Sequence, residues 1–156
     1  MSKIIITNSE KETINFGKKF VAQLKAGTII GLVGKLGAGK TQFVKGLAQG
    51  LGIKNNITSP TFVLLKTYNL PARHRCAQAL AGGQLTTNDL QLIHVDCYRL
   101  SSPEELADIG WRELVSDKNN IIVVEWADKI RKIMPKNTIW IKFSIGKKDN
   151  QRKISI

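Results

Sequence analysis

The stretch that decides the fold is TIIGLVGKLGAGKT, residues 28–41. Residues 28–33 are mostly apolar without alternation, which is typical of a strand buried on both faces of a parallel sheet. Residues 34–41 match the phosphate-loop pattern G-x-x-x-x-G-K-[ST] in full. A helix is expected to begin at about Lys40 and to end near Gly50 or Gly52. Strand, loop and helix thus follow one another in the order that phosphate-binding α/β proteins use.

The chemistry of such a loop is specific. Its glycines let backbone amides approach phosphates, and the positive end of the following helix points at them. We expect Lys40 to reach the β- and γ-phosphates and the Thr41 hydroxyl to bind Mg²⁺. The alternative is a glycine-rich turn formed by chance, which would not explain the full pattern with both flanks. The sequence therefore predicts a nucleoside triphosphate site formed by Gly34, Lys35, Leu36, Gly37, Ala38, Gly39, Lys40, Thr41 and Gln42.

Outward from this stretch, further apolar runs alternate with helix signals. Strands separated by helical crossovers indicate an α/β fold. We predict a three-layer, P-loop NTPase-like fold, with a mainly parallel sheet, antiparallel edge strands and a C-terminal hairpin. The expected strands are residues 28–33, 61–68, 91–96, 121–125, 138–145 and 152–156, and the expected helices begin after Ser9, at Lys40 and after Ser102, the first of them ending at Gly27.

Length predicts one domain covering residues 1–156, since 156 residues and 17.3 kDa lie within the usual domain size. The segment 71–90 differs in composition, because it contains no lysine and no isoleucine. We expect it to be a surface insertion. A functional lid is the alternative, because long loops are often functional.

The composition excludes several classes of protein. Hydrophobic residues make up 42% and charged residues 23%, which is ordinary for a globular protein and excludes a disordered chain. No apolar run reaches the roughly 18–20 residues of a membrane span, and the isoleucines at residues 4–6 are too few for a signal-peptide core. Two cysteines, Cys76 and Cys97, form no disulfide framework. We therefore expect a soluble cytoplasmic protein.

The charge balance is unusual. Twenty-four lysines and arginines against twelve acids give a formal net charge of +12. Such an excess attracts polyanions, including nucleic acid and acidic partners. The cations are scattered along the chain, so compositional drift without a dedicated surface is an equal alternative.

Two carboxylates follow apolar strands, Asp96 and Glu125. Ligands bind at the carboxyl ends of parallel strands, so either carboxylate could hold Mg²⁺ or position a water molecule, while capping the following segment is the alternative for each. Thr61 stands about twenty residues after Lys40, where a switch threonine could sense the γ-phosphate, although a simple turn would also explain it. An Asn-Lys-x-Asp element for guanine is missing from the sequence, which favours ATP.

Five motifs follow one another along the chain: GAGKT (37–41), SPTF (59–62), HVDCYRL (94–100), PEEL (103–106) and VEW (124–126). In this order they resemble the TsaE (YjeE) family. The resemblance covers nearly the whole chain and implies a cytoplasmic P-loop ATPase that binds and hydrolyses Mg-ATP. It further implies partnership with the TsaD and TsaB proteins, which form N6-threonylcarbamoyladenosine at position 37 of tRNAs reading ANN codons, and proximity to tRNA through that complex. The transfer itself would belong to TsaD.

The resemblance also assigns roles to residues. It implies Lys40 on the phosphates and Thr41 with Glu125 on Mg²⁺. Asp96 would assist hydrolysis or the metal's outer shell, and Thr61 would be the switch threonine. The candidate catalytic residues are thus Lys40, Asp96, Glu125 and Thr61, with Trp126 beside the site and Glu10 and Thr13 near the adenine.

Two departures from the family pattern stand out. The segment 71–90 is longer than the turn expected there, and Ala127-Asp128 replaces an expected proline or serine followed by Glu or Gln. Neither touches the phosphate loop.

Two other functions compete with the ATPase. A small P-loop kinase would transfer the γ-phosphoryl group to a metabolite or nucleoside, and usually needs an arginine-bearing lid. The candidate lid arginines are Arg73, Arg75 and Arg131. A nucleotide-dependent binding module with negligible turnover is the third possibility.

Overall fold

A seven-stranded mixed sheet runs through the part of the chain that the computed structural model describes, residues 3–71 and 90–156. The strand order is β1-β7-β6-β2-β5-β4-β3. The four central strands β6, β2, β5 and β4 are parallel to one another, whereas β7 and β1 at one edge and β3 at the other are antiparallel. This confirms the predicted fold class and the C-terminal hairpin. The strands are β1 (Ile4–Thr7), β2 (Ile29–Val33), β3 (Leu65–Asn69), β4 (Gln91–Asp96), β5 (Asn120–Glu125), β6 (Ile139–Ile145) and β7 (Arg152–Ser155).

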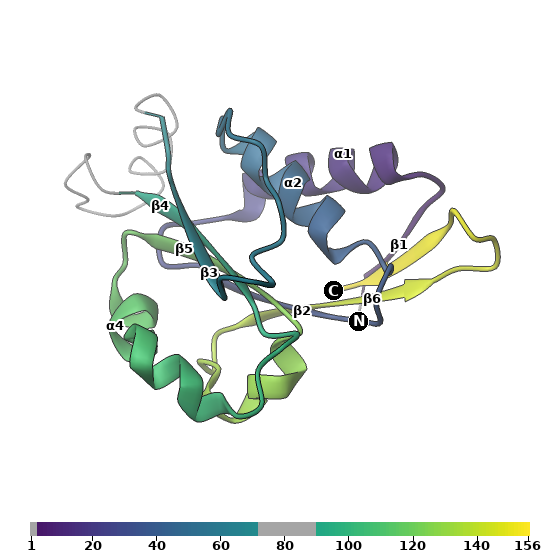
Figure 1. Ribbon diagram of the computed structural model, residues 1–156. Helices are drawn as coiled ribbons and strands as arrows, with labels where there is room; N and C mark the ends of the chain where they lie inside the picture. Colours follow the sequence, from purple (N-terminus) through teal and green to yellow (C-terminus); the bar gives the residue numbers. More distant parts are fainter. Residues whose placement is uncertain (1–2, 72–89) are drawn as a thin grey trace.

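Helices cover both faces of the sheet, which gives three layers (Figure 1). One core lies under α1 and α2 and includes Phe20, Phe43 and Leu32. The second core lies under the helices of the opposite face and includes Trp111 and Ile130. Burial on both sides explains why β2, β4 and β5 are nearly continuous apolar runs, whereas β6 alternates buried and exposed residues toward its end. The helices are α1 (Glu10–Phe20), α2 (Lys40–Gly50) and α4 (Trp111–Ser116), and the 3-10 helices are η1 (Val21–Gln23), η2 (Pro103–Ile109) and η3 (Ala127–Ile133).

α1 crosses α2 at two glycines. A Cβ on Gly46 would overlap the backbone carbonyl of Ile14, and a Cβ on Gly17 would overlap that of Phe43. Larger side chains at these positions would push the two helices apart. The close crossing therefore helps to hold the start of α1 beside the phosphate loop, where Glu10 lines the same cavity as the loop.

Several boundaries differ from the sequence predictions. β1 was not predicted, because its short isoleucine run is recognisable as a strand only once it pairs with β7. The first helix ends at Phe20 rather than at Gly27 and continues as a short 3-10 turn. The segment after Ser102 is a 3-10 helix that ends at Ile109 and is followed by Gly110, whose φ is +71°.

The predicted strand over residues 61–68 is also shorter than expected. Residues 61–63 form a turn, since the amides of Val63 and Leu64 both bond back to the Pro60 carbonyl, at 2.9 and 2.7 Å. β3 then starts only at Leu65. The turn carries Thr61 toward the end of β4, where it bonds to Asp96.

Most of the predicted insertion lies outside the described residues, as do Cys76, Arg73 and Arg75. Within residues 3–71 and 90–156, none of the helices has the length and hydrophobicity that crossing a membrane requires.

Candidate functional site

A cavity of about 460 Å³ opens where β2, β4 and β5 end and α2 begins. Thirteen of the fifteen predicted site residues line it. Gly34 and Lys35 are the two exceptions, and they meet the site only through backbone carbonyls that bond to Lys40. The thirteen are Glu10, Thr13, Leu36, Gly37, Ala38, Gly39, Lys40, Thr41, Gln42, Thr61, Asp96, Glu125 and Trp126.

The phosphate loop leads directly into α2, and the first residues of α2 line this cavity. Gly39, the N-cap of α2, has a φ of +98°, a conformation that glycine adopts without strain, and it provides no side-chain cap. The first amides of a helix have no partner within the helix, and the helix dipole adds partial positive charge there. The start of α2 is therefore built to receive an anion.

Lys40 is buried between the loop and an aromatic ring. Its Nζ donates to the carbonyls of Gly34 at 2.6 Å and Lys35 at 3.0 Å, and lies 3.9 Å from the centroid of the Trp126 ring. Burial lowers the pKa of Lys40 below its ordinary value, although nearby carboxylates, Glu125 first among them, act in the opposite direction. Among the described residues, none of the carboxylates forms a direct ion pair with the ammonium.

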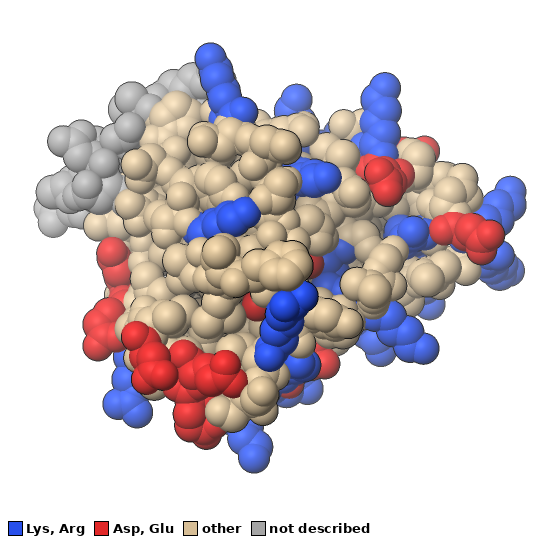
Figure 2. All heavy atoms as spheres, in the orientation of Figure 1, with Lys and Arg blue, Asp and Glu red and all other residues tan. Residues whose placement is uncertain are grey.

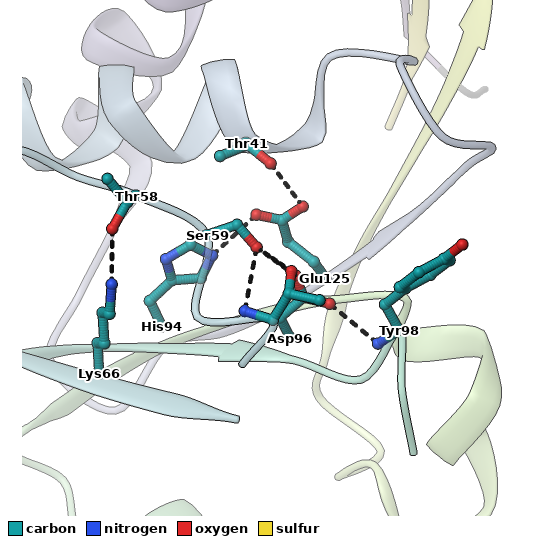
Figure 3. Close-up of polar contacts among 9 residues, drawn as sticks. Thr41, Thr58, Ser59, Lys66, His94, Asp96, Tyr98 and Glu125 are labelled. Atoms are coloured by element: carbon teal, nitrogen blue, oxygen red, sulfur yellow. Dashed lines mark hydrogen bonds and ion pairs between the residues drawn. The ribbon is translucent and has the colours of Figure 1, made fainter. Parts of the chain in front are cut away.

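Glu125 is the carboxylate that contacts Thr41 (Figure 3). The Thr41 hydroxyl donates to Glu125 Oε2 at 2.9 Å, and His94 Nε2 lies 2.8 Å from Glu125 Oε1. Two oxygen ligands in cis positions on an octahedral Mg²⁺, each at about 2.1 Å, lie about 3 Å apart. The oxygens of Thr41 and Glu125 therefore fit a magnesium ion in both chemistry and spacing.

Asp96 is engaged by the turn that precedes β3. Its Oδ2 accepts a hydrogen bond from the Ser59 hydroxyl, and its Oδ1 accepts one from the Tyr98 amide at 2.9 Å (Figure 3). Oδ2 also accepts a hydrogen bond from the Thr61 hydroxyl at 2.6 Å. Both carboxylate oxygens thus have protein donors. Asp96 is placed to hold the turn, while Glu125 stands beside Thr41.

Trp126 lines the cavity beside Lys40. Trp126 immediately follows β5, and its backbone φ is +58°, which is uncommon for a residue with a large side chain. The ring lies against Lys40 and also packs against Tyr98, with ring centroids 5.0 Å apart and ring planes tilted by 45°. The Trp126 ring therefore covers the buried ammonium, and Tyr98 supports that ring.

The comparisons with known proteins agree with these features. The family described as "Threonylcarbamoyl adenosine biosynthesis protein TsaE" matches residues 7–154. The chain belongs to the TsaE family. It is 37% identical to the "tRNA threonylcarbamoyladenosine biosynthesis protein TsaE" of Treponema pallidum over 151 residues, which cover 97% of each chain. The protein with the same description from Borreliella burgdorferi is 36% identical over 137 residues, covering 88% of this chain and 87% of that one.

A solved structure shares the fold. The crystal structure of YdiB from Bacillus subtilis superposes with a TM-score of 0.73 at 29% sequence identity, covering 99% of this chain and 84% of that chain. The description of the TsaE family refers to threonylcarbamoyl adenosine biosynthesis.

Different elements line the cavity on the two sides of β2. Glu125 and Asp96 come from β5 and β4, whereas Glu10 and Thr13 come from α1, near the other edge of the sheet. Thr13 is buried, and its hydroxyl lies 2.8 Å from that of Thr7. Glu10 and Thr13 therefore line the cavity from the side away from the two carboxylates.

Several lining or contacting residues were missed by the sequence analysis. Ser59 and Tyr98 were within the recognised motifs but were given no role. His94 could have been noticed, because residues two apart in a strand share a face and Asp96 is two residues further on. Asn150 and Arg152 line the cavity from the C-terminal hairpin, where Arg152 Nε donates to the Gly37 carbonyl at 3.1 Å.

Charge on the visible face is dispersed. Figure 2 shows lysines and arginines spread over that face, while acidic side chains gather at its lower left. Exposed acids of η2 and α4 include Glu104, Glu105, Asp108 and Glu113. The cations of this face thus form no continuous track.

Proposed function

We propose that this chain binds and hydrolyses Mg-ATP and thereby supports a TsaD–TsaB complex that forms N6-threonylcarbamoyladenosine at position 37 of tRNAs reading ANN codons. The observation that carries the ATPase assignment is the meeting of Lys40, Thr41 and Glu125 in one cavity at the start of α2. Membership of the TsaE family supports the pathway.

The residues divide the work by position. The amides at the start of α2 would bind the phosphates, and Lys40 would exchange its loop carbonyls for β- and γ-phosphate oxygens. Thr41 and Glu125 would hold Mg²⁺, which when bound neutralises the charge that develops during phosphoryl transfer. Asp96 would orient the attacking water, and Thr61 would sense the γ-phosphate by leaving its bond to Asp96.

Exposed apolar side chains near the cavity support the proposal of a protein partner. Leu36 and Tyr98 are exposed and line the cavity, and the exposed Phe62 and Val63 directly follow the lining residue Thr61 in the chain. Phe62 is 82% exposed and Leu36 is 73% exposed. We call Leu36, Phe62, Val63 and Tyr98 the apolar rim. Exposed apolar patches beside functional clefts are typical of protein interfaces, so TsaD or TsaB docking over the nucleotide is proposed. Such docking would bring the domain close to tRNA only through the complex, and we propose that it acts in the cytoplasm.

The kinase alternative has less support among the described residues. Arg131 stacks on Trp140, with the guanidinium 4.6 Å from the ring centroid, and does not line the cavity. A lid formed by this arginine would have to leave that contact.

The test is Mg-ATP hydrolysis by the purified chain, alone and with a TsaD–TsaB pair added. We expect phosphate release to rise when the pair is added, and to fall again when Glu125→Ala replaces the unmodified chain. ATP binding without phosphate release in either mixture would contradict the ATPase proposal. Transfer of phosphate to an added metabolite or nucleoside would favour the kinase.

A further inference from the structure

His94 is a buried polar side chain that the proposed chemistry does not yet use. It lies in β4, is fully buried, and faces the helices α1 and α2 on the same side of the sheet as Asp96. Its Nε2 lies 2.8 Å from Glu125 Oε1 (Figure 3). Within the described residues, its Nδ1 has no hydrogen-bond partner. Burying an imidazole costs free energy unless its contacts repay it, so the contact with Glu125 is the one that accounts for it.

The contact fixes which ring nitrogen carries hydrogen. A hydrogen on Nε2 lets the ring donate to the carboxylate, whereas a bare Nε2 would set its lone pair against Oε1. The register supports the contact, because β4 and β5 are parallel neighbours with His94 opposite Val123 and Asp96 opposite Glu125. His94 therefore reaches Glu125 from one strand over and two residues back.

The two oxygens of Glu125 consequently have separate partners. Oε1 faces His94, which leaves Oε2 directed at Thr41. Without the His94 donor, the carboxylate could rotate toward the ammonium of Lys40, with which it already interacts electrostatically. A carboxylate that turned toward Lys40 would no longer face Thr41 and would be lost to the metal.

We infer that His94 is a positioning residue that holds the Glu125 carboxylate against Thr41 and so sets the affinity of the nucleotide-loaded site for Mg²⁺. This inference rests on the proposed Mg-ATP site. Removing such outer-shell partners typically lowers metal affinity about 10–100-fold.

The experiment compares variants with and without a donor at this position. His94→Gln retains an N–H near the place of Nε2, whereas His94→Leu removes it. His94→Met is a second donor-free variant, with a flexible side chain that adapts to the site if leucine prevents folding. Ile93→Ala is the matched control, because Ile93 is a buried neighbour in β4 that faces the opposite core. Each chain is saturated with a non-hydrolysable ATP analogue and titrated with MgCl₂, and the half-saturating Mg²⁺ concentration is read from the shift in melting temperature.

We expect the half-saturating Mg²⁺ concentration of the donor-free variants to rise at least about tenfold. That of His94→Gln should stay within about threefold of the value for the unmodified chain. Ile93→Ala should lower the melting temperature and leave the Mg²⁺ requirement unchanged. Binding of the analogue in EDTA should be the same in all variants, because the inferred effect acts on the metal.

Two results would overturn the inference. One is a donor-free variant that folds and keeps the Mg²⁺ requirement of the unmodified chain. The other is an Ile93→Ala chain whose Mg²⁺ requirement rises as much as that of His94→Leu, which would make the effect a general loss of stability. If the unmodified chain binds the analogue with no response to Mg²⁺, the proposed metal site fails as well, which distinguishes the two failures.

Discussion

Replacing Lys40 by methionine should separate nucleotide affinity from fold stability. Methionine keeps the unbranched apolar stem but removes the ammonium that bonds to the carbonyls of Gly34 and Lys35. In the nucleotide-free protein, two hydrogen bonds to a charged donor are lost, each of about 1.5–3 kcal/mol. The cost of burying the charge, of several kcal/mol, is removed at the same time. We therefore expect the free energy of unfolding to change little.

The effect on ATP should be much larger. An ammonium about 4 Å from a phosphate charge contributes about 4 kcal/mol at the effective dielectric constant of a protein surface. Since about 1.4 kcal/mol corresponds to a tenfold change in affinity, loss of Lys40 should weaken ATP binding by about three orders of magnitude. The lysine is 4% exposed, so solvent screens it little.

The assay is titration of a fluorescent ATP analogue, with melting temperatures recorded in parallel. Lys45→Met is the matched control, because Lys45 lies in the same helix, loses the same charge and is not among the residues lining the cavity. It should change the affinity by less than about threefold. An affinity of Lys40→Met close to that of Lys45→Met would refute the assignment of the phosphate site.

Three further outcomes follow from the structure. ATP affinity should be highest while Lys40 carries its charge and should fall as the pH rises through its lowered pKa, at a lower pH than for an ordinary lysine. Lys40→Arg stays charged and should remove this decline. Identical pH profiles of ATP affinity for the unmodified chain and Lys40→Arg would contradict the argument. Gly46→Ala should lower the free energy of unfolding by about 1–3 kcal/mol in denaturant titrations, because its Cβ would overlap a carbonyl of α1, while the exposed Gln49→Ala of the same helix should have little effect. Thr61→Val, which removes the donor to Asp96, should slow ATP hydrolysis at least about tenfold with nucleotide affinity retained; a parallel loss of affinity would argue against a switch role.

The phosphate loop illustrates what local sequence predicts well. The amides, the lysine and the threonine of residues 34–41 are joined by a few consecutive bonds, so their spacing along the chain limits their spacing in space. The strand before the loop and the helix after it were predicted for the same reason. Asp96 and Glu125 were recognised as site candidates because both end apolar strands whose carboxyl ends meet at one edge of the sheet.

The residues by themselves left open which of those two carboxylates contacts Thr41, and only the family resemblance implied that it is Glu125. The arrangement depends on the turn over residues 61–63, which brings the hydroxyls of Ser59 and Thr61 onto Asp96 and leaves Glu125 to Thr41. That turn was mistaken for the beginning of a strand, since β-branched and aromatic residues favour a strand locally and only the bonds to the Pro60 carbonyl reverse the chain.

By itself, the sequence determined that this protein has a phosphate loop in an α/β fold and belongs with the TsaE family, because those features are carried by contiguous motifs and their order. The tertiary structure alone decided that β1 closes one edge, that Arg152 and Asn150 reach the cavity, and that His94 holds Glu125. These contacts join residues far apart along the chain, and they exist only after strand order and register have been set by packing on both faces of the sheet.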